Sequence, residues 1–193
     1  MVVQQSPHTA TLQGAHERAA APLVSVPPAT RRLSIRSTPS HSADGHRGTQ
    51  PWWLLAVQGG AGVSSLIRAG ADGQDADRSW PTGGFVVAVT RRTAYGLEWA
   101  RDAARQHASS GVSGGVVLAG LVVVADAPGR APRRLARFLD LVCGAYPRVW
   151  EVPWVEEWRL AGHDEPLPAP PAVRQLRDDM RALTGAGTDR EKE

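Results

Sequence analysis

A short apolar run that ends at a group of glycines constrains the possible folds of this chain most. Residues 52–57, Trp-Trp-Leu-Leu-Ala-Val, have the composition of a buried strand, and Gly-Gly-Ala-Gly follows at residues 59–62. Ser64 then begins what the sequence indicates is a helix. A strand, a glycine-rich turn and a helix N-terminus in this order direct free backbone N–H groups and the positive end of the helix dipole towards a phosphate. Glycine suits such a turn because a side chain would block the phosphate and because some of its residues adopt a positive φ angle.

The chemistry of this turn differs from that of a functional P-loop. A P-loop follows its last glycine with lysine and then with serine or threonine. Here Val63 stands at the position of the lysine, whereas Ser64 stands at the position of the hydroxyl that binds magnesium. The sequence therefore predicts a phosphate-binding turn that has lost its cation. A tight turn between a strand and a helix, with no ligand, is the alternative.

The residues from Gln58 to Ser65 resemble the deviant P-loop of the ParA/MinD-type ATPases, which carries an additional lysine just before its paired glycines. Gln58 stands at that position, so both lysine positions lack a cation. One charge-assisted hydrogen bond contributes roughly 1.5–3 kcal/mol, and the lysines also offset charge that develops during phosphoryl transfer. The resemblance therefore implies a degenerate ATPase that binds nucleotide weakly and does not hydrolyse it.

Further segments carry the same resemblance. Residues 86–91 and 121–126 are similar to two successive strands of that family, of which the second helps to recognise the base, and residues 151–154 are similar to its following apolar-Pro-aromatic turn. The resemblance implies ATP with magnesium as the cofactor and Ser64 as the magnesium ligand. The candidate nucleotide-binding residues are Gln58, Gly59, Gly60, Ala61, Gly62, Val63, Ser64, Ser65, Asp126 and Pro153.

The match to the ParA/MinD-type ATPases is incomplete. Only about twenty residues separate the glycine turn from the next matching strand, whereas that family has two further strands and an acidic switch there. The body looks more closely like an actinobacterial family of uncharacterised proteins that share the Gly-Gly-Ala-Gly-Val-Ser loop. Genes of that family lie near plasmid and conjugative-element functions, which implies a setting rather than an activity.

Asp126 allows three interpretations. It follows a run of apolar residues, as the acidic residue of a Walker B strand does, and it begins an Asp-Ala-Pro-Gly sequence of the form found in nucleotide-sensing switches. Its place in the order of the matching segments favours a base-reading role instead. The third interpretation is a carboxylate that caps the turn before Pro132, and the sequence leaves all three open.

The rest of the chain alternates between apolar and amphipathic segments. Strands are predicted at residues 52–57, 85–89, 118–125 and 148–152, and helices from residue 64, over 93–109, over 132–143 and over 172–184. This alternation predicts an α/β fold in which helices flank a parallel sheet on both faces. The resemblance implies a reduced three-layer sandwich like that of the P-loop NTPases. Ligands of such sheets bind at the carboxyl ends of the strands. Those ends are residues 58–65, 90–93, 126–130 and 153–157.

Three regions are expected along the chain. Residues 1–50 are rich in Pro, Ser, Thr and Ala and carry the whole formal net charge of +3, so they are expected to form a disordered basic tail. Residues 51–162 are expected to form the α/β domain. Residues 163–193 are expected to form a Pro-rich linker and a C-terminal helix with a charged tail.

The segment between the first two predicted strands contains Asp72, Asp75 and Asp77. Three aspartates suggest a calcium-binding loop, but the glycine and the glutamate that such a loop requires are out of register. We therefore expect a solvated loop that Trp80 anchors in the body.

Composition limits the compartment and the partners. Cys143 is the only cysteine, which excludes an internal disulfide and favours a reducing, cytoplasmic location. The first residues lack the features of a signal peptide, and the longest apolar run, residues 116–125, is too short to cross a bilayer. No contact with nucleic acid is expected outside the basic tail, because the remainder of the chain has no formal net charge.

The sequence thus predicts a pseudo-ATPase that regulates or scaffolds, with another protein or a second copy of itself as its partner. The alternative is an enzyme of low activity on a nucleotide or another phosphorylated ligand, which would use Ser64 and Asp126. Isolated histidines and the absence of a nucleophile with its base favour the first interpretation.

Two features of the folded chain would decide whether the turn holds a ligand. An arginine that reaches the turn from Arg91, Arg92 or Arg130 would favour binding, whereas an apolar plug such as Trp80 would exclude it. If the turn keeps the shape of a P-loop, Val63→Lys is expected to restore nucleotide affinity. If the valine packs inward, the same change is expected to destabilise the fold.

Overall fold

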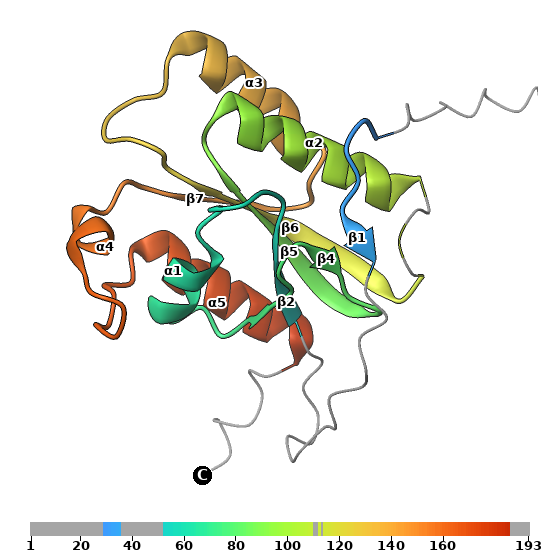
Figure 1. The fold of residues 1–193 in the computed structure, drawn as a ribbon. Helices are drawn as coiled ribbons and strands as arrows, with labels where there is room; N and C mark the ends of the chain where they lie inside the picture. Colours follow the sequence, from blue (N-terminus) through green and yellow to red (C-terminus); the bar gives the residue numbers. More distant parts are fainter. Residues whose placement is uncertain (1–28, 36–51, 110–111, 113, 186–193) are drawn as a thin grey trace, which may run out of the picture.

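The computed structural model describes residues 29–35, 52–109, 112 and 114–185 (Figure 1). Within these residues the main sheet has five parallel strands in the order β3-β2-β5-β6-β7. The strands are β2 (Trp52–Ala56), β3 (Gln74–Asp75), β5 (Gly84–Arg91), β6 (Val116–Val124) and β7 (Val149–Val152). Two short strands, β1 (Ser34–Ile35) and β4 (Ser79–Trp80), pair in parallel separately from it. The helices are α1 (Val63–Arg68), α2 (Ala94–Ala108), α3 (Arg133–Cys143), α4 (Glu156–Leu160) and α5 (Pro171–Thr184).

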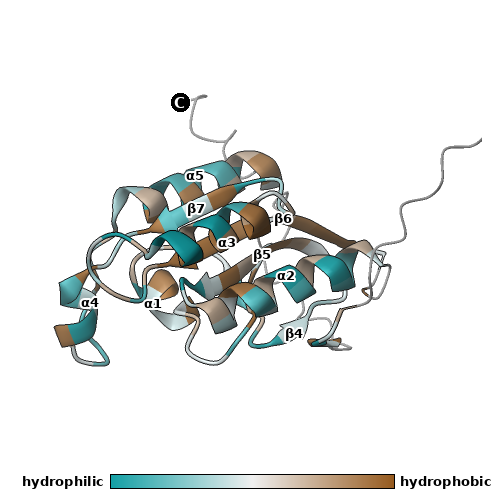
Figure 2. Cartoon of the chain, turned by 90° about the horizontal axis from the view of Figure 1, so that it is seen from above, coloured by the Kyte–Doolittle hydropathy of each residue, from teal (hydrophilic) through white to brown (hydrophobic). Residues whose placement is uncertain are grey.

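Helices cover both faces of the main sheet, which confirms the predicted α/β fold with three layers. Helices α1 and α5 pack on one face, and α2 and α3 pack on the other. Figure 2 shows hydrophilic and hydrophobic residues on separate sides of the longer helices, whereas β6 is mainly hydrophobic. A parallel strand that is covered on both faces has this continuous apolar composition.

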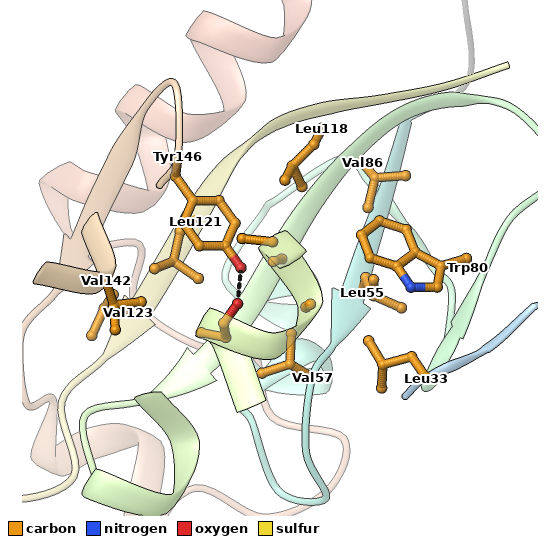
Figure 3. Close-up of a cluster of buried hydrophobic side chains, with 14 of the residues drawn as sticks. Leu33, Leu55, Val57, Trp80, Val86, Leu118, Leu121, Val123, Val142 and Tyr146 are labelled. Atoms are coloured by element: carbon orange, nitrogen blue, oxygen red, sulfur yellow. Dashed lines mark hydrogen bonds between the residues drawn. The ribbon is translucent and has the colours of Figure 1, made fainter. Parts of the chain in front are cut away.

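The first of two core clusters lies between the sheet and the helices α2 and α3 (Figure 3). Trp80 is fully buried in it, as predicted. Tyr146 is also buried there, and its hydroxyl donates a hydrogen bond to the carbonyl oxygen of Ala100 at 2.6 Å. Burial raises the pKa of this hydroxyl. A buried phenol with a carbonyl acceptor is a satisfied polar group, so Tyr146 joins α2 to the segment before β7.

Helix α2 begins directly at the end of β5. Thr93 is the N-cap, as predicted, and its side chain accepts a hydrogen bond from the backbone nitrogen of Gly96 at 3.0 Å. A Cβ atom on Gly96 would lie 2.6 Å from Oε1 of Gln58 and 2.7 Å from Oγ1 of Thr90. Glycine is therefore required at this position, and it brings the first turn of α2 against the residues that follow β2.

Strand β3 differs from the predicted solvated loop. Gln74 and Asp75 pair in parallel with Trp53 and Leu54 and form one edge of the sheet. The chain can pass close to Trp52 before β3 because residue 73 is glycine. A Cβ atom at this position would lie only 2.6 Å from the indole ring of Trp52. A strand of two residues has no periodicity of its own, so sequence patterns could not reveal it.

The C-terminal helix is part of the same body and not a separate appendage. Val173, Leu176 and Met180 of α5 are buried in the second core cluster, which lies on the face of the sheet that α1 also covers. The indole nitrogen of Trp150 in β7 donates a hydrogen bond to Asp179 at 2.9 Å. The α/β unit therefore extends beyond the predicted boundary at residue 162, as far as residue 184.

Residues 29–35 also lie against the body, in contrast to the prediction that residues 1–50 form a disordered tail. Leu33 is buried in the first core cluster. The physical reason is that this segment pairs with β4 and bonds to polar side chains of α2, contacts that composition alone does not predict. The remaining parts of residues 1–50 lie outside the described residues. No helix in the described ranges has the length and apolar composition needed to cross a membrane.

Candidate functional site

The glycine turn lies where the order of the strands reverses. From β2 the chain passes through α1 to β3 on one side, and it continues with β5 on the other side of β2. In open α/β sheets such a reversal leaves a crevice at the carboxyl ends of the two strands, and ligands bind there. The residues after β2 and after β5 border this crevice.

Residues 58–65, here called the glycine loop, carry backbone N–H groups that have no protein acceptor among the described residues. Gly60 and Gly62 have φ angles of 70° and 106°, which residues with side chains rarely adopt. Gly62 is the N-cap of α1 and supplies no side-chain cap. Across the described part of the chain, no backbone N–H group from Gln58 to Ser65 donates a hydrogen bond. These N–H groups are therefore free to bind an anion.

The glycine loop forms one wall of a cavity of about 550 Å³. This volume lies within the range of small-molecule sites, roughly 300–1,000 Å³. The cavity is lined by Ala56, Gln58, Gly59, Gly60, Ala61, Gly62, Val63, Ser64, Ser65, Asp75, Asp77, Arg78, Ser79 and Arg91. The structure thus brings all the predicted residues of the glycine loop together on one cavity.

Arg91 is the arginine that reaches the glycine loop. Its Nε donates a hydrogen bond to the carbonyl oxygen of Gly60 at 3.0 Å, and its Nη1 donates to that of Ala125 at 3.3 Å. Arg92 bonds instead to the carbonyl oxygen of Gly129 at 3.2 Å. Because Arg91 ties the glycine loop to the end of β6, its guanidinium group is held at the mouth of the cavity.

Trp80 does not plug the cavity. It is fully buried in the first core cluster, on the side of the sheet that α2 covers. Two features were expected to decide ligand binding. The arginine at the glycine loop is present, and the plug by Trp80 is not formed.

Val63 and Ser64 have different environments at the start of α1. Val63 is 5% exposed and packs in the second core cluster together with Leu66, although it borders the cavity. Of the two outcomes expected for a lysine at this position, the inward packing of Val63 favours destabilisation of the fold. Ser64 is exposed and lines the cavity.

Gln58 places a buried amide beside the glycine loop. Its side chain is almost fully buried, and its Oε1 has no hydrogen-bond partner among the described residues. It lies against the first turn of α2, next to Gly96. An unpaired buried amide that lines a cavity is unusual, because such a group normally destabilises the fold by about 1–3 kcal/mol.

The wall opposite the glycine loop was not predicted. Asp75, Asp77, Arg78 and Ser79 line the cavity, and Asp77 has a φ angle of 53°. The backbone nitrogen of Asp77 donates to Oδ1 of Asp75 at 2.7 Å, and its carbonyl oxygen accepts from Ala56 at 2.9 Å. The group of aspartates was the available signal, but only the pairing of β3 with β2 places it at the cavity.

A second, smaller cavity of about 160 Å³ adjoins the first, because Ser65 and Arg91 line both. Pro153, Trp154 and Trp158 line the second cavity. The structure therefore places Pro153, one of the predicted site residues, in the cavity that adjoins the glycine loop. Asp126 is exposed and lines neither cavity. Among the described residues, no three His, Cys, Asp or Glu side chains gather as a metal site.

Comparison with known proteins gives a family for this chain. A family model matches residues 50–175, which is more than half of the chain. The chain belongs to DUF6668. The description of DUF6668 is a family of unknown function. No curated protein and no solved structure matches the chain.

Both cavities lie inside the span that defines DUF6668. The glycine loop, the wall formed by residues 75–79 and the aromatic residues of the second cavity all fall within residues 50–175. Residues 29–35 precede this span. The candidate site therefore belongs to the family unit, whereas the N-terminal segment that packs against it does not.

Proposed function

We propose that this protein is a pseudo-ATPase, a non-hydrolysing module of P-loop type that binds the phosphates of a nucleotide at the glycine loop and regulates or scaffolds a partner. The observation that carries the proposal is the row of unpaired N–H groups on a cavity of about 550 Å³ at the reversal of strand order. Backbone donors in this arrangement bind phosphate oxygens.

Arg91 supplies a cation that the sequence of the loop lacks. Its guanidinium group already bonds to Gly60 in the loop, and it lines both cavities. Arginine binds phosphate with a planar set of donors, so it can substitute for lysine as a phosphate ligand. Magnesium would arrive with the phosphates, because it retains waters and needs few protein ligands. Ser64 is the exposed hydroxyl of the cavity that would bind it.

The second cavity supports a nucleotide over free phosphate. Trp154 and Trp158 offer flat apolar surfaces, and the indole nitrogen of Trp158 is already bonded to the carbonyl oxygen of Pro168 at 2.9 Å. A ligand that extends from the first cavity past Ser65 and Arg91 would bring its base to these side chains.

The absence of hydrolysis in this proposal follows from the residues of the loop. Val63 is part of the core and carries no charge to offset that of a transferring phosphoryl group. The alternative of a low-activity enzyme requires Asp126 to act beside Ser64, and Asp126 lines neither cavity. A ligand that is bound without turnover acts by stabilising the state that binds it, which is the property of a regulator.

Gly59→Leu tests the proposal, with Gly114→Leu as the matched control. Nothing lies within 4 Å of a Cβ atom at either glycine, and neither has a φ angle in the left-handed region, so both variants should fold. Gly59 borders the cavity and Gly114 does not. We expect calorimetry with magnesium-ATP and with pyrophosphate to show binding to the wild type and to Gly114→Leu. Gly59→Leu should bind at least about ten-fold more weakly, because its side chain occupies the phosphate position.

Arg91→Gln tests the cation, with Arg92→Gln as the control. Loss of a charge-assisted contact should weaken binding by about ten- to a hundred-fold for Arg91→Gln only. A wild-type protein that binds neither magnesium-nucleotide nor pyrophosphate would overturn the proposal. Release of phosphate from ATP by the wild type, abolished in Ser64→Ala, would overturn its non-hydrolysing character.

A further inference from the structure

Residues 31–35 lie against β4 and α2, and the surface of β4 and α2 that they cover is here called the strap groove. The strands β1 and β4 pair in parallel over two residues. Only Leu33 of this segment enters the first core cluster, where it is 5% exposed. The segment is thus bound as an extended peptide on the edge of a strand.

The floor of the strap groove consists of polar side chains of α2. The backbone nitrogen of Leu33 donates to Oε1 of Gln106 at 2.9 Å, and Nε2 of Gln106 donates to the carbonyl oxygen of Leu33 at 2.9 Å. The backbone nitrogen of Arg31 donates to Oδ2 of Asp102 at 3.2 Å. Main-chain hydrogen bonds of this kind contribute to the affinity for an extended ligand, and contacts with its side chains add the specificity.

Alternate side chains of the segment then meet the groove. Arg31 forms an ion pair with Glu98 at 2.7 Å and a longer one with Asp102 at 3.5 Å. Arg32 points outward and is exposed, and Leu33 points inward. The contacts of this segment thus involve the side chains of an arginine and a leucine two residues apart.

The floor of the groove is suited to opening as well as to being covered. Buried polar side chains need partners, as these have, and a polar surface can also be returned to water with a smaller loss than an apolar one. Asp102 has further partners in Arg101 at 3.6 Å and Arg105 at 3.5 Å, which keep its charge compensated when the segment leaves. Gln106 would then become exposed to water, to which Glu98 is already partly exposed.

The groove and its occupant also differ in their relation to the family. Strand β4 and helix α2 lie within residues 50–175, which the model of DUF6668 matches, whereas residues 29–35 precede that span. The family match therefore covers β4 and α2 and does not extend to residues 29–35.

We propose that the strap groove is a strand-addition site for an extended Arg-x-Leu peptide of a partner protein, and that residues 31–33 are a resident copy of that peptide which a partner displaces. The acidic and amide groups of α2 select the arginine and the main chain, and the opening at the first core cluster selects the leucine. This proposal does not depend on ligand binding at the glycine loop.

The test uses a labelled peptide with the sequence of residues 29–37 and full-length variants. Leu33→Asp should release the resident segment, because it places a carboxylate in the core. Ile35→Asp is the matched control, since Ile35 lies two residues further along the same segment but is 52% exposed. We expect the peptide to bind Leu33→Asp at least about ten-fold more tightly than it binds the wild type or Ile35→Asp, in which the groove is filled. A peptide with alanine at both the arginine and the leucine should not bind.

Equal binding of the peptide to all three proteins, or no binding to a folded Leu33→Asp, would overturn the proposal. If Leu33→Asp does not fold, hydrogen exchange of the wild type decides. A displaceable segment opens locally, so the Leu33 amide should exchange at least about a hundred-fold faster than the amides of β5. Equal protection of Leu33 and β5 would make the segment a permanent part of the core and overturn the proposal.

Discussion

Val63 occupies the first position of α1, and its side chain is packed among apolar neighbours under the glycine loop. In a P-loop the same position carries the lysine that contacts phosphate. The glycine loop therefore presents unpaired backbone N–H groups within the described part of the chain, whereas the side chain of Val63 belongs to the core. Arg91 at the end of β5 bonds to the same loop, so the cation at the loop comes from a different strand end than Val63.

Val63→Lys should lower stability and should not be rescued by nucleotide. Burying the ammonium group in the second core cluster is expected to reduce the free energy of unfolding by roughly 2–4 kcal/mol. Ile67→Lys is the control, because Ile67 is in the same helix and is 37% exposed, and it should cost less than about 0.5 kcal/mol. Thermal unfolding with and without magnesium-ATP measures both effects. A stable Val63→Lys protein that gains nucleotide affinity would contradict the packing of this residue.

At the scale of elements, α5 shows how much of the body lies beyond the Pro-rich segment. The sequence predicts this helix correctly from its amphipathic pattern, but the pattern does not say which surface it covers. In the structure α5 covers β6 and β7 on the same face of the sheet as α1, because α1 is too short to reach these strands. Asp179 is bonded to Trp150 and also lies 3.5 Å from Arg148, so polar contacts fix where the helix sits.

Leu176→Ala measures the contribution of α5 to the fold. Leu176 is fully buried, and truncation of a buried leucine typically costs about 2–5 kcal/mol because a cavity remains. Leu183→Ala in the same helix removes a side chain that is 37% exposed, and we expect a cost below about 1 kcal/mol. Denaturant unfolding of the full chain gives both values. Similar small losses would show that α5 is only loosely attached.

At the scale of the whole molecule, the sequence predicted the layers better than the site. Buried strands such as β5 and amphipathic helices leave long periodic signals, and the glycine loop has a recognisable order of residues. The wall at Asp75 and Asp77 and the strap groove depend on strands of two residues each. Such pairings are decided by contacts between distant segments, which no local pattern records.

Trp99 has a consequence for how these two parts of the molecule communicate. The guanidinium group of Arg31 lies 5.8 Å from the centre of its ring, and that of Arg78, which lines the cavity, lies 5.4 Å from it. Two cations on one ring repel each other. A phosphate that attracts Arg78 would relieve this repulsion and allow Arg31 to hold its place more firmly.

Thermodynamic linkage makes this effect reciprocal. If bound pyrophosphate raises the equilibrium constant for docking of residues 31–35 by some factor, docking of these residues raises the affinity for pyrophosphate by the same factor. We expect a factor of roughly five, at the low end of measured couplings. Hydrogen exchange at Leu33 with and without pyrophosphate gives one side of the cycle, and calorimetry of wild type against Leu33→Asp gives the other. In Arg78→Gln both factors should fall to one. Release of the segment with no replacement would thereby loosen the hold on the anion, whereas a peptide that places its own arginine at Trp99 would restore it.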